Sequence, residues 1–540
     1  MSRLRPSRWP LVLGGALGLL AGLFFGSWGG PAEERPAPPI TNREAVIPPQ
    51  CYTRTEGTHN PCYVCHQDQD GRADPNAMND GFLQGAYAFS DYGMTNRWKN
   101  LFRDRREAVA AISDAEIAAY VAENNYTPLR RALAADPDWS GYTPDLANLH
   151  RAGAAFDAQG FAKDGSGWVA FNYKPFPSTF WPTNGSTDDV MVRLPAAFRQ
   201  SACGDVAGRY SRDTYLANLA ILEAAIKDRR RITLPAVDEA TFCQDLNGDG
   251  RRGTITELRR PEHYVGAAAD TAVTAGLYPQ GTEFLHSVRY VGVDAAGRVY
   301  PTPRLKELRY MRKIRFYDKA QLRSLYGNEH QEKRDGNLPT FTATGHGLDN
   351  GFGWLVLGFI EDEHGELRKQ TREEQRFCMG CHTTMGATID QTFAFPRKVT
   401  GARGWGYLDL DGMRDAPHKG ASEGEILQYL RRVGGGSEFR DNEEMQRRWF
   451  DEEGNVRADK VRAADVADLI TPSRERAQRL NKAYRVIVQA QSFVHGRDAT
   501  VEPATNVYEA VPGDSAPLPA AADTASSWRV PSWRRPGERR

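Results

Sequence analysis

The chain has 540 residues with 69 basic and 69 acidic side chains, and 40% of its residues are hydrophobic. This balance is typical of a soluble globular body, and the length suggests two to four domains or one large domain with insertions. No basic stripe is interleaved with aromatic residues, which argues against nucleic-acid binding. The short arginine runs at 229–231 and 534–535 fit a solvated helix end and a tail.

The first 30 residues form a targeting segment. Arg3, Arg5 and Arg8 precede an uncharged stretch over residues 9–28, which is long for a signal peptide and long enough to span a bilayer. The glycines recur every four residues, on one helix face suited to packing against another transmembrane helix; they are Gly14, Gly18, Gly22 and Gly26. Cleavage and retention both stay open. Either way the body is exported to the periplasm, soluble or anchored in the inner membrane. No cysteine directly follows the apolar run, which argues against a lipid anchor.

Residues 31–50 are rich in Pro, Ala and Glu and read as a linker. Helical periodicity predicts helices over 102–124, with a break at Ser113-Asp114, and over 211–230. Two hairpins are predicted at 286–301 and 354–369, and further helices at 371–378, 423–432 and 473–492. Residues 501–540, rich in Pro, Ala and Ser, are expected to be a disordered tail.

Two segments carry the pattern Cys-x-x-Cys-His, at Cys62, Cys65 and His66 and again at Cys378, Cys381 and His382. Two thiols at this spacing can add to the vinyl groups of one porphyrin, and the next residue places an imidazole under the iron. A thioredoxin-like pair would not need the histidine. A four-cysteine zinc site would leave both histidines unexplained. We therefore expect two haem c groups.

On these two motifs the chain resembles the c-type cytochromes. The resemblance implies export, since haem c is attached outside the cytoplasm in bacteria. It leads us to expect a di-haem cytochrome that transfers electrons between redox partner proteins. An alternative is a di-haem oxidoreductase similar to the cytochrome c peroxidase and MauG-like group, in which one haem iron is open and a calcium ion lies between the haems. Whether the chain is an enzyme stays open.

The ligand on the other side of each iron decides its chemistry, and the sequence offers several donors. The candidates are His59 and Met94 near the first motif, and His346, Met413 and His418 near the second.

A calcium loop is suggested by Asp245, Asn247 and Asp249, whose oxygens alternate before Gly250. The pattern departs at position twelve, where Thr256 stands in place of a glutamate, so an ordinary surface turn is the alternative. Of the remaining cysteines, we favour a disulfide between Cys203 and Cys243, with Cys51 left over, although three pairings are open.

These observations predict an α+β fold, predominantly helical and loop-rich around two haems, with a few β-hairpins. The expected organisation is a targeting segment at 1–30, a linker at 31–50 and a first haem region at 51–340. A second haem domain follows at 341–500 and a disordered tail at 501–540.

Overall fold

The protein was analysed as a computed structural model, and the structure describes residues 46–53, 93–175, 177, 186–335, 340–382, 389–419, 421–433, 442–511 and 527–533. The targeting segment and the first Cys-x-x-Cys-His motif lie outside these residues. From residue 40 onward the chain forms a single contact unit.

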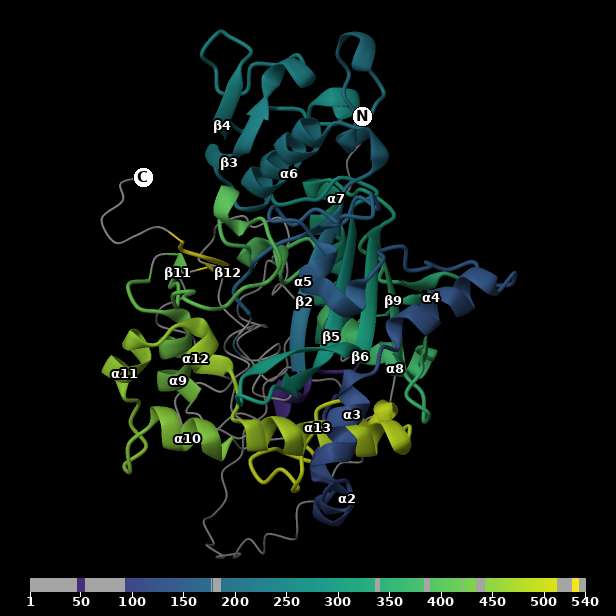
Figure 1. Cartoon of the computed structure of the whole chain (residues 1–540), viewed down its shortest axis with the longest axis vertical. Helices are drawn as coiled ribbons and strands as arrows, with labels where there is room; N and C mark the ends of the chain where they lie inside the picture. The colour runs from purple at the N-terminus through teal and green to yellow at the C-terminus, as the bar shows by residue number, and fades with distance from the viewer. Residues whose placement is uncertain are drawn as a thin grey trace, which may run out of the picture. The chain divides into compact units, whose positions relative to one another are not determined.

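An eight-stranded antiparallel sheet dominates the described residues (Figure 1). Its strand order is β1-β2-β5-β6-β9-β8-β7, and β10 pairs with β9. The strands are β1 (Val169–Ala170), β2 (Ser186–Arg193), β5 (Glu283–Val293), β6 (Val299–Lys313), β7 (Thr342–Thr344), β8 (Gly347–Asp349), β9 (Trp354–Glu361) and β10 (Leu367–Lys369). The sheet crosses residue 340, where the sequence suggested a domain boundary.

Two small antiparallel sheets accompany it. One is the hairpin of β3 (Arg231–Asp238) and β4 (Thr254–Arg259), which lies beside α6 in Figure 1. The other pairs β11 (His418–Lys419) with β12 (Ser527–Pro531). Part of the predicted disordered tail therefore forms a strand, and Val511 donates a backbone hydrogen bond to Met94.

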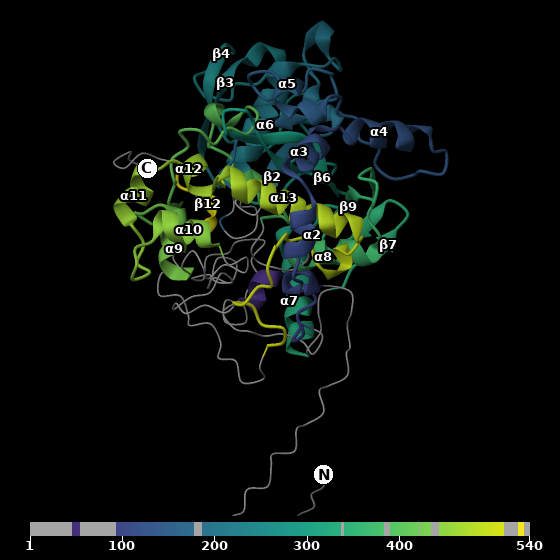
Figure 2. The same cartoon turned by 60° about the horizontal axis from the view of Figure 1, so that its bottom comes forward.

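Helices cover the sheet on both faces. The helices are α2 (Arg106–Ala111), α3 (Asp114–Ala122), α4 (Tyr126–Ala135), α5 (Ala152–Ala155), α6 (Arg212–Ile226), α7 (Lys319–Arg334), α8 (Arg372–His382), α9 (Glu425–Val433), α10 (Glu443–Trp449), α11 (Ala458–Ala463), α12 (Val466–Ile470) and α13 (Arg474–Gln489). Helices α2, α3 and α13 pack together along β5 and β6, and α9 to α12 gather beside β11 (Figures 1 and 2).

Several local predictions are confirmed. The break at Ser113 separates α2 from α3, because the Ser113 hydroxyl accepts a hydrogen bond from the backbone N–H of Glu116 at 3.1 Å and begins a new helix. The hairpin turns at 294–297 and 362–366 join β5 to β6 and β9 to β10. Helix α6 occupies most of the predicted 211–230 segment.

The prediction of a predominantly helical, loop-rich fold with a few hairpins is wrong, because the central element is a large sheet. Charged residues within the strands obscure the sequence pattern by which strands are predicted. Strand β2 carries Asp188 and Asp189, and β6 carries Lys306 and Glu307, yet all four side chains are buried. A strand buried on both faces does not alternate between polar and apolar residues, so its period-2 signal is lost.

Candidate functional site

A cavity of about 240 Å³ lies against one face of the central sheet. Antiparallel pairing places neighbouring residues of adjacent strands on the same face. One row across β2, β5, β6 and β9 is Val190, His286, Arg309 and Gly358. A second is Val192, Phe284, Met311 and Val356. All of these except Val192 line the cavity, so the sheet forms one of its walls.

Helix α8 forms another wall and presents Cys378, Cys381 and His382 to the cavity. Residues three and four apart share one side of a helix, so the spacing of the motif brings the two thiols and the imidazole together. A capping box begins the helix: the Thr371 hydroxyl accepts from the Glu374 N–H at 3.2 Å, and the Glu374 carboxylate accepts from the Thr371 N–H at 2.8 Å.

The imidazole of His382 is held in a defined orientation. Its Nδ1 lies 3.1 Å from the backbone carbonyl oxygen of Gln391 and donates to it, and its ring meets Phe393 edge-on at 5.4 Å between ring centres. Burial lowers the pKa of His382 to about 4, and the positive charge of Arg309 lowers it further. The ring is therefore neutral at pH 7, and Nε2 carries the lone pair that a metal ion would need.

Gln391 is positioned by a buried ion pair beside it. Asp390 pairs with Lys313 and accepts hydrogen bonds from the Tyr278 backbone N–H at 2.7 Å and from the Trp354 indole at 3.2 Å. Asp390 and Gln391 both have positive φ, at 44° and 66°. These contacts hold the turn that aims the Gln391 carbonyl at His382.

Arginine side chains surround the thiols. The Arg497 guanidinium lies 3.9 Å from the Cys378 sulfur and donates to the Glu374 carbonyl at 2.6 Å. Glu307 lies 3.6 Å from Arg497 and 2.9 Å from Arg309. These two cations share one carboxylate, which leaves this end of the cavity electropositive.

The sheet also contributes a polar group of side chains to the cavity. The His286 Nε2 lies 3.6 Å from the Asp188 carboxylate, and the Lys306 ammonium donates to the Ser186 hydroxyl at 3.0 Å. Lys306 also lies over the ring of Tyr484 at 4.4 Å. Burial lowers the pKa of Lys306 to about 7. The Tyr484 hydroxyl is buried and has no hydrogen-bond partner in the part of the chain that the structure describes.

A network of buried charged side chains lies beside the cavity at Arg397. Glu425 accepts from the guanidinium of Arg397, with a nearest N–O distance of 2.5 Å, and from the ammonium of Lys174 at 2.8 Å. Lys174 also pairs with Asp415 at 2.6 Å. Burial raises the pKa of Glu425, but the charges of Arg397 and Lys174 outweigh it and lower that pKa to about 2.

The ligand candidates from the sequence lie away from this cavity. The His346 Nδ1 is 2.5 Å from the Ser140 carbonyl, and Met413 packs in a separate hydrophobic cluster with α9 and α10. His418 lies in β11, and Met94 accepts the backbone hydrogen bond from Val511. None of these four residues lines the cavity. Cys62, Cys65, His66 and His59 lie outside the described residues, so the first motif stays a prediction.

The residues of the suggested calcium loop form hydrogen bonds with one another. The Asp245 carboxylate accepts from the backbone N–H groups of Gly248 and Gly250 at 2.6 and 2.7 Å, and the Asn247 amide donates to Asp249 at 2.9 Å. Among the described residues, no three or more His, Cys, Asp or Glu side chains are grouped to hold a metal ion. Calcium at this loop stays a prediction.

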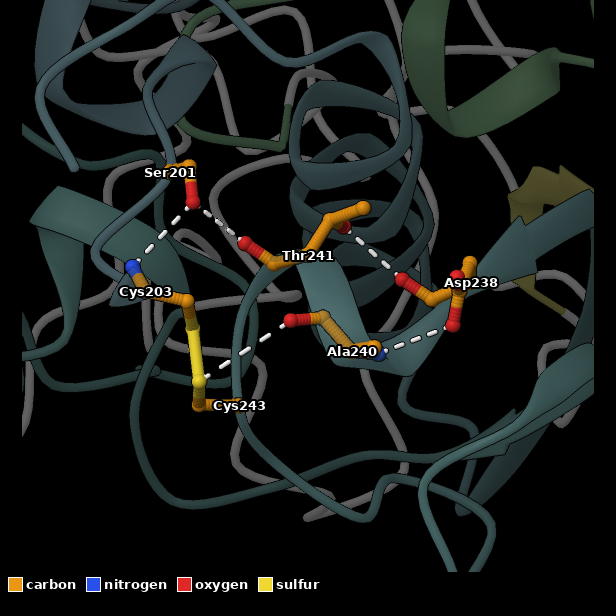
Figure 3. Close-up of a disulfide and its surroundings, with 6 residues drawn as sticks. All are labelled: Ser201, Cys203, Asp238, Ala240, Thr241 and Cys243. Atoms are coloured by element: carbon orange, nitrogen blue, oxygen red, sulfur yellow. Dashed lines mark hydrogen bonds between the residues drawn. A yellow bond between two sulfur atoms is a disulfide. The ribbon is translucent and has the colours of Figure 1, made fainter. Parts of the chain in front are cut away.

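The disulfide between Cys203 and Cys243 is confirmed, with 5.8 Å between the Cα atoms (Figure 3). The Ser201 hydroxyl links its two flanking segments, accepting from the Cys203 backbone N–H and donating to the Thr241 carbonyl. An internal disulfide is typical of a protein that folds outside the cytoplasm.

The residue that sequence reasoning missed is His286. It lies within a strand of the predicted hairpin, far in the sequence from both Cys-x-x-Cys-His motifs, and it reaches the cavity only because β5 lies at the centre of the sheet. No local pattern marks such a residue.

Among the described helices, none has the length and apolar composition needed to cross a membrane, and residues 9–28 lie outside them.

Comparison with known proteins overturns the cytochrome assignment. Residues 37–469 match the sequence model of a family described as a "-like lipoprotein". The chain is 30% identical over 517 residues to an "Uncharacterized lipoprotein" of Aquifex aeolicus (strain VF5), an alignment that covers 85% of this chain and 86% of the relative. No solved structure matches the chain.

The prediction of a di-haem electron-transfer cytochrome is therefore wrong, and so is its alternative of a peroxidase or MauG-like enzyme. Ten residues of motif carried that resemblance, whereas the lipoprotein family model extends over most of the chain. The sequence argued against a lipid anchor, because the first cysteine, Cys51, lies well beyond the apolar run. Membership of a lipoprotein family overturns that argument. An association with the cell envelope follows. The chain belongs to this lipoprotein family.

Proposed function

We propose that this envelope protein binds haem c covalently in its central cavity, through Cys378 and Cys381, with His382 as an iron ligand. The observation that carries the proposal is the hydrogen bond from His382 Nδ1 to the Gln391 carbonyl. A metal-binding histidine commonly donates its other ring N–H to a carbonyl or carboxylate, which fixes the ring and its tautomer. No electron-carrier or peroxidase role is proposed.

The cavity supports this cofactor by its composition. Haem is a flat apolar ring with two carboxylates on one edge. Apolar side chains line the cavity from the sheet and from the 389–397 segment, among them Val190, Phe284, Val288, Met311, Phe393 and Phe395. Arg309 and Arg497 supply positive charge that suits the carboxylates. When bound, the haem would supply an iron centre with one side held by His382.

We also propose that the body of the protein lies in the periplasm. The charged segment before residues 9–28 favours export, and the Cys203–Cys243 disulfide fits an oxidising compartment. The body would be soluble or anchored in the inner membrane by residues 9–28. The helix partner suggested by the Gly14, Gly18, Gly22 and Gly26 face and the redox partner proteins stay predictions.

The test is covalent haem content. The full chain, with its own leader, is produced in a bacterium that exports it and attaches haem c, and the denatured protein is measured by mass and by haem absorbance. We expect two haems per chain if both motifs are loaded. Cys378→Ala with Cys381→Ala should remove one haem, and Cys62→Ala with Cys65→Ala should remove the other.

The matched control is Cys203→Ala with Cys243→Ala, which removes two cysteines outside the motifs and should leave the haem count per chain unchanged. Haem content that is absent from the wild type, or that does not fall in the Cys378→Ala, Cys381→Ala chain, would show that the cavity does not hold covalent haem.

A further inference from the structure

The cavity has an imidazole on each of two walls. His382 comes from the end of α8, and His286 comes from the middle of β5, in the central row of the sheet wall. Its neighbours in that row are Val190 on β2 and Arg309 on β6. Both imidazoles line the same cavity. A ligand that is held by α8 and fills this cavity would therefore also meet the sheet wall that carries His286.

The surroundings of His286 suit a metal ligand. Asp188 lies 3.6 Å from its Nε2, and a carboxylate beside one ring nitrogen orients an imidazole and raises its basicity. Asp188 comes from the adjacent strand β2, which is paired along its whole length with β5. The imidazole is thus carried on a strand that is hydrogen-bonded to a neighbour on each side, β2 and β6.

Other donor side chains in the cavity have different roles. Met311 packs in the main hydrophobic core with Phe284 and Val356. The Lys306 ammonium donates to Ser186 and lies over two tyrosine rings, and the Tyr310 hydroxyl donates to Glu283. His286 is the residue whose chemistry and position both fit a second iron ligand.

We propose that His286 supplies the second axial nitrogen to the iron of the haem bound at Cys378 and Cys381, with Asp188 as its positioning residue. This inference rests on the proposed function. It replaces the distal candidates near the second motif with a residue of the central sheet. Two imidazole ligands give a low-spin iron and a lower reduction potential than a histidine–methionine pair.

The experiment compares the oxidised full-length wild type with His286→Ala by absorption and electron paramagnetic resonance spectroscopy, after haem content is measured for both. We expect the variant to keep its covalent haem and to lose the low-spin signal of one haem per chain, with a high-spin signal in its place. Added imidazole should restore the low-spin signal by occupying the vacated position.

His346→Ala is the matched control, because His346 lies on the exposed turn between β7 and β8 and should leave the spectra unchanged. His286→Gln, which is closer in size, serves if the alanine variant does not accumulate. Asp188→Asn should keep the ligand but shift the spectrum of the same haem.

The outcomes separate the two proposals. A wild type without covalent haem at Cys378 and Cys381 would contradict the proposed function. Covalent haem at full content with identical spectra in wild type, His286→Ala and His286→Gln would leave the proposed function standing and overturn the assignment of His286.

Discussion

The Nδ1 of His382 and the backbone carbonyl oxygen of Gln391 are 3.1 Å apart, and a buried ion pair next to Gln391 holds that carbonyl in place. The ring of His382 is therefore oriented by the backbone of a turn, and that turn depends on the contact between Asp390 and Lys313. The stability of this turn can be tested separately from cofactor binding.

Asp390→Ala should lower the free energy of unfolding by about 3–5 kcal/mol, because it leaves the Lys313 ammonium buried without its partner. The indole of Trp354 would lose an acceptor as well. Urea unfolding of the purified chain measures the change. Asp349→Ala is the control, since it breaks a more exposed pair with Arg315 and should cost about 1 kcal/mol or less. Equal effects of the two substitutions would contradict the prediction.

Lys306→Met should remove a pH dependence of stability. Burial lowers the pKa of Lys306 in the folded chain to about 7, whereas the ordinary value is 10.5. Between these values the unfolded chain binds more protons, so the free energy of unfolding of the wild type rises with pH, by up to about 1.4 kcal/mol per unit. The Lys306→Met chain lacks this titrating group, so its free energy of unfolding lacks this dependence on pH.

The measurement is urea unfolding of wild type and Lys306→Met across the range between the two pKa values. The difference between the two chains should change with pH, and the exposed substitution Lys460→Met should give a difference that stays constant. A pH-independent difference for Lys306→Met would show that Lys306 does not titrate in this range.

Glu425→Gln should lower the free energy of unfolding at neutral pH and have a smaller effect in acid. The charges of Arg397 and Lys174 hold the pKa of Glu425 at about 2, below its ordinary 4.5. Its contribution is therefore present above pH 4.5 and is lost as pH falls towards 2, and it amounts to roughly 3 kcal/mol. The variant should be less stable than wild type at neutral pH, and the gap should narrow in acid.

Thermal unfolding at neutral and acidic pH measures this gap. The exposed Glu257, paired with Arg231, provides the comparison: Glu257→Gln should have a small effect at every pH. A gap for Glu425→Gln that stays the same on acidification would contradict the assigned pKa.

Cys203→Ser with Cys243→Ser should lower the free energy of unfolding by about 3–4 kcal/mol in the chain-entropy view, because the disulfide closes a loop across 40 positions of the sequence. Chemical unfolding of both chains without reductant gives the difference. Adding a reductant should destabilise the wild type and leave the variant unaffected; the same response in both would argue against the bond.

The sequence predicted local structure better than architecture. Helix limits near Ser113 and Thr371 have capping side chains that are readable from neighbouring residues. The central sheet has no such marker, because its strands bury charged residues such as Asp189 and Arg289, which satisfy one another across adjacent strands at 3.2 Å. Pairing of this kind depends on residues 100 positions apart in the chain.

In the candidate site, too, the local features could be predicted from the sequence and the contacts between distant segments could not. The thiols and His382 could be named from spacing alone, because all three fall within a short stretch of one helix. His286, Asp188 and the Gln391 carbonyl reach them from other elements, so only the fold shows them together. The ten-residue resemblance to cytochromes therefore located a part of the site without identifying the family.

A Cβ added to Gly380 would lie 1.8 Å from the carbonyl oxygen of Val46, so the backbone near the start of the described chain rests directly on the helix between the two thiols. Trp98 packs edge-on against Phe377 of the same helix, with 4.6 Å between ring centres. These contacts join segments that are far apart in the sequence. The segment around Val46 is synthesised before α8, so these contacts form only once α8 is present. A side chain larger than glycine at position 380 would displace Val46 from this side of the helix.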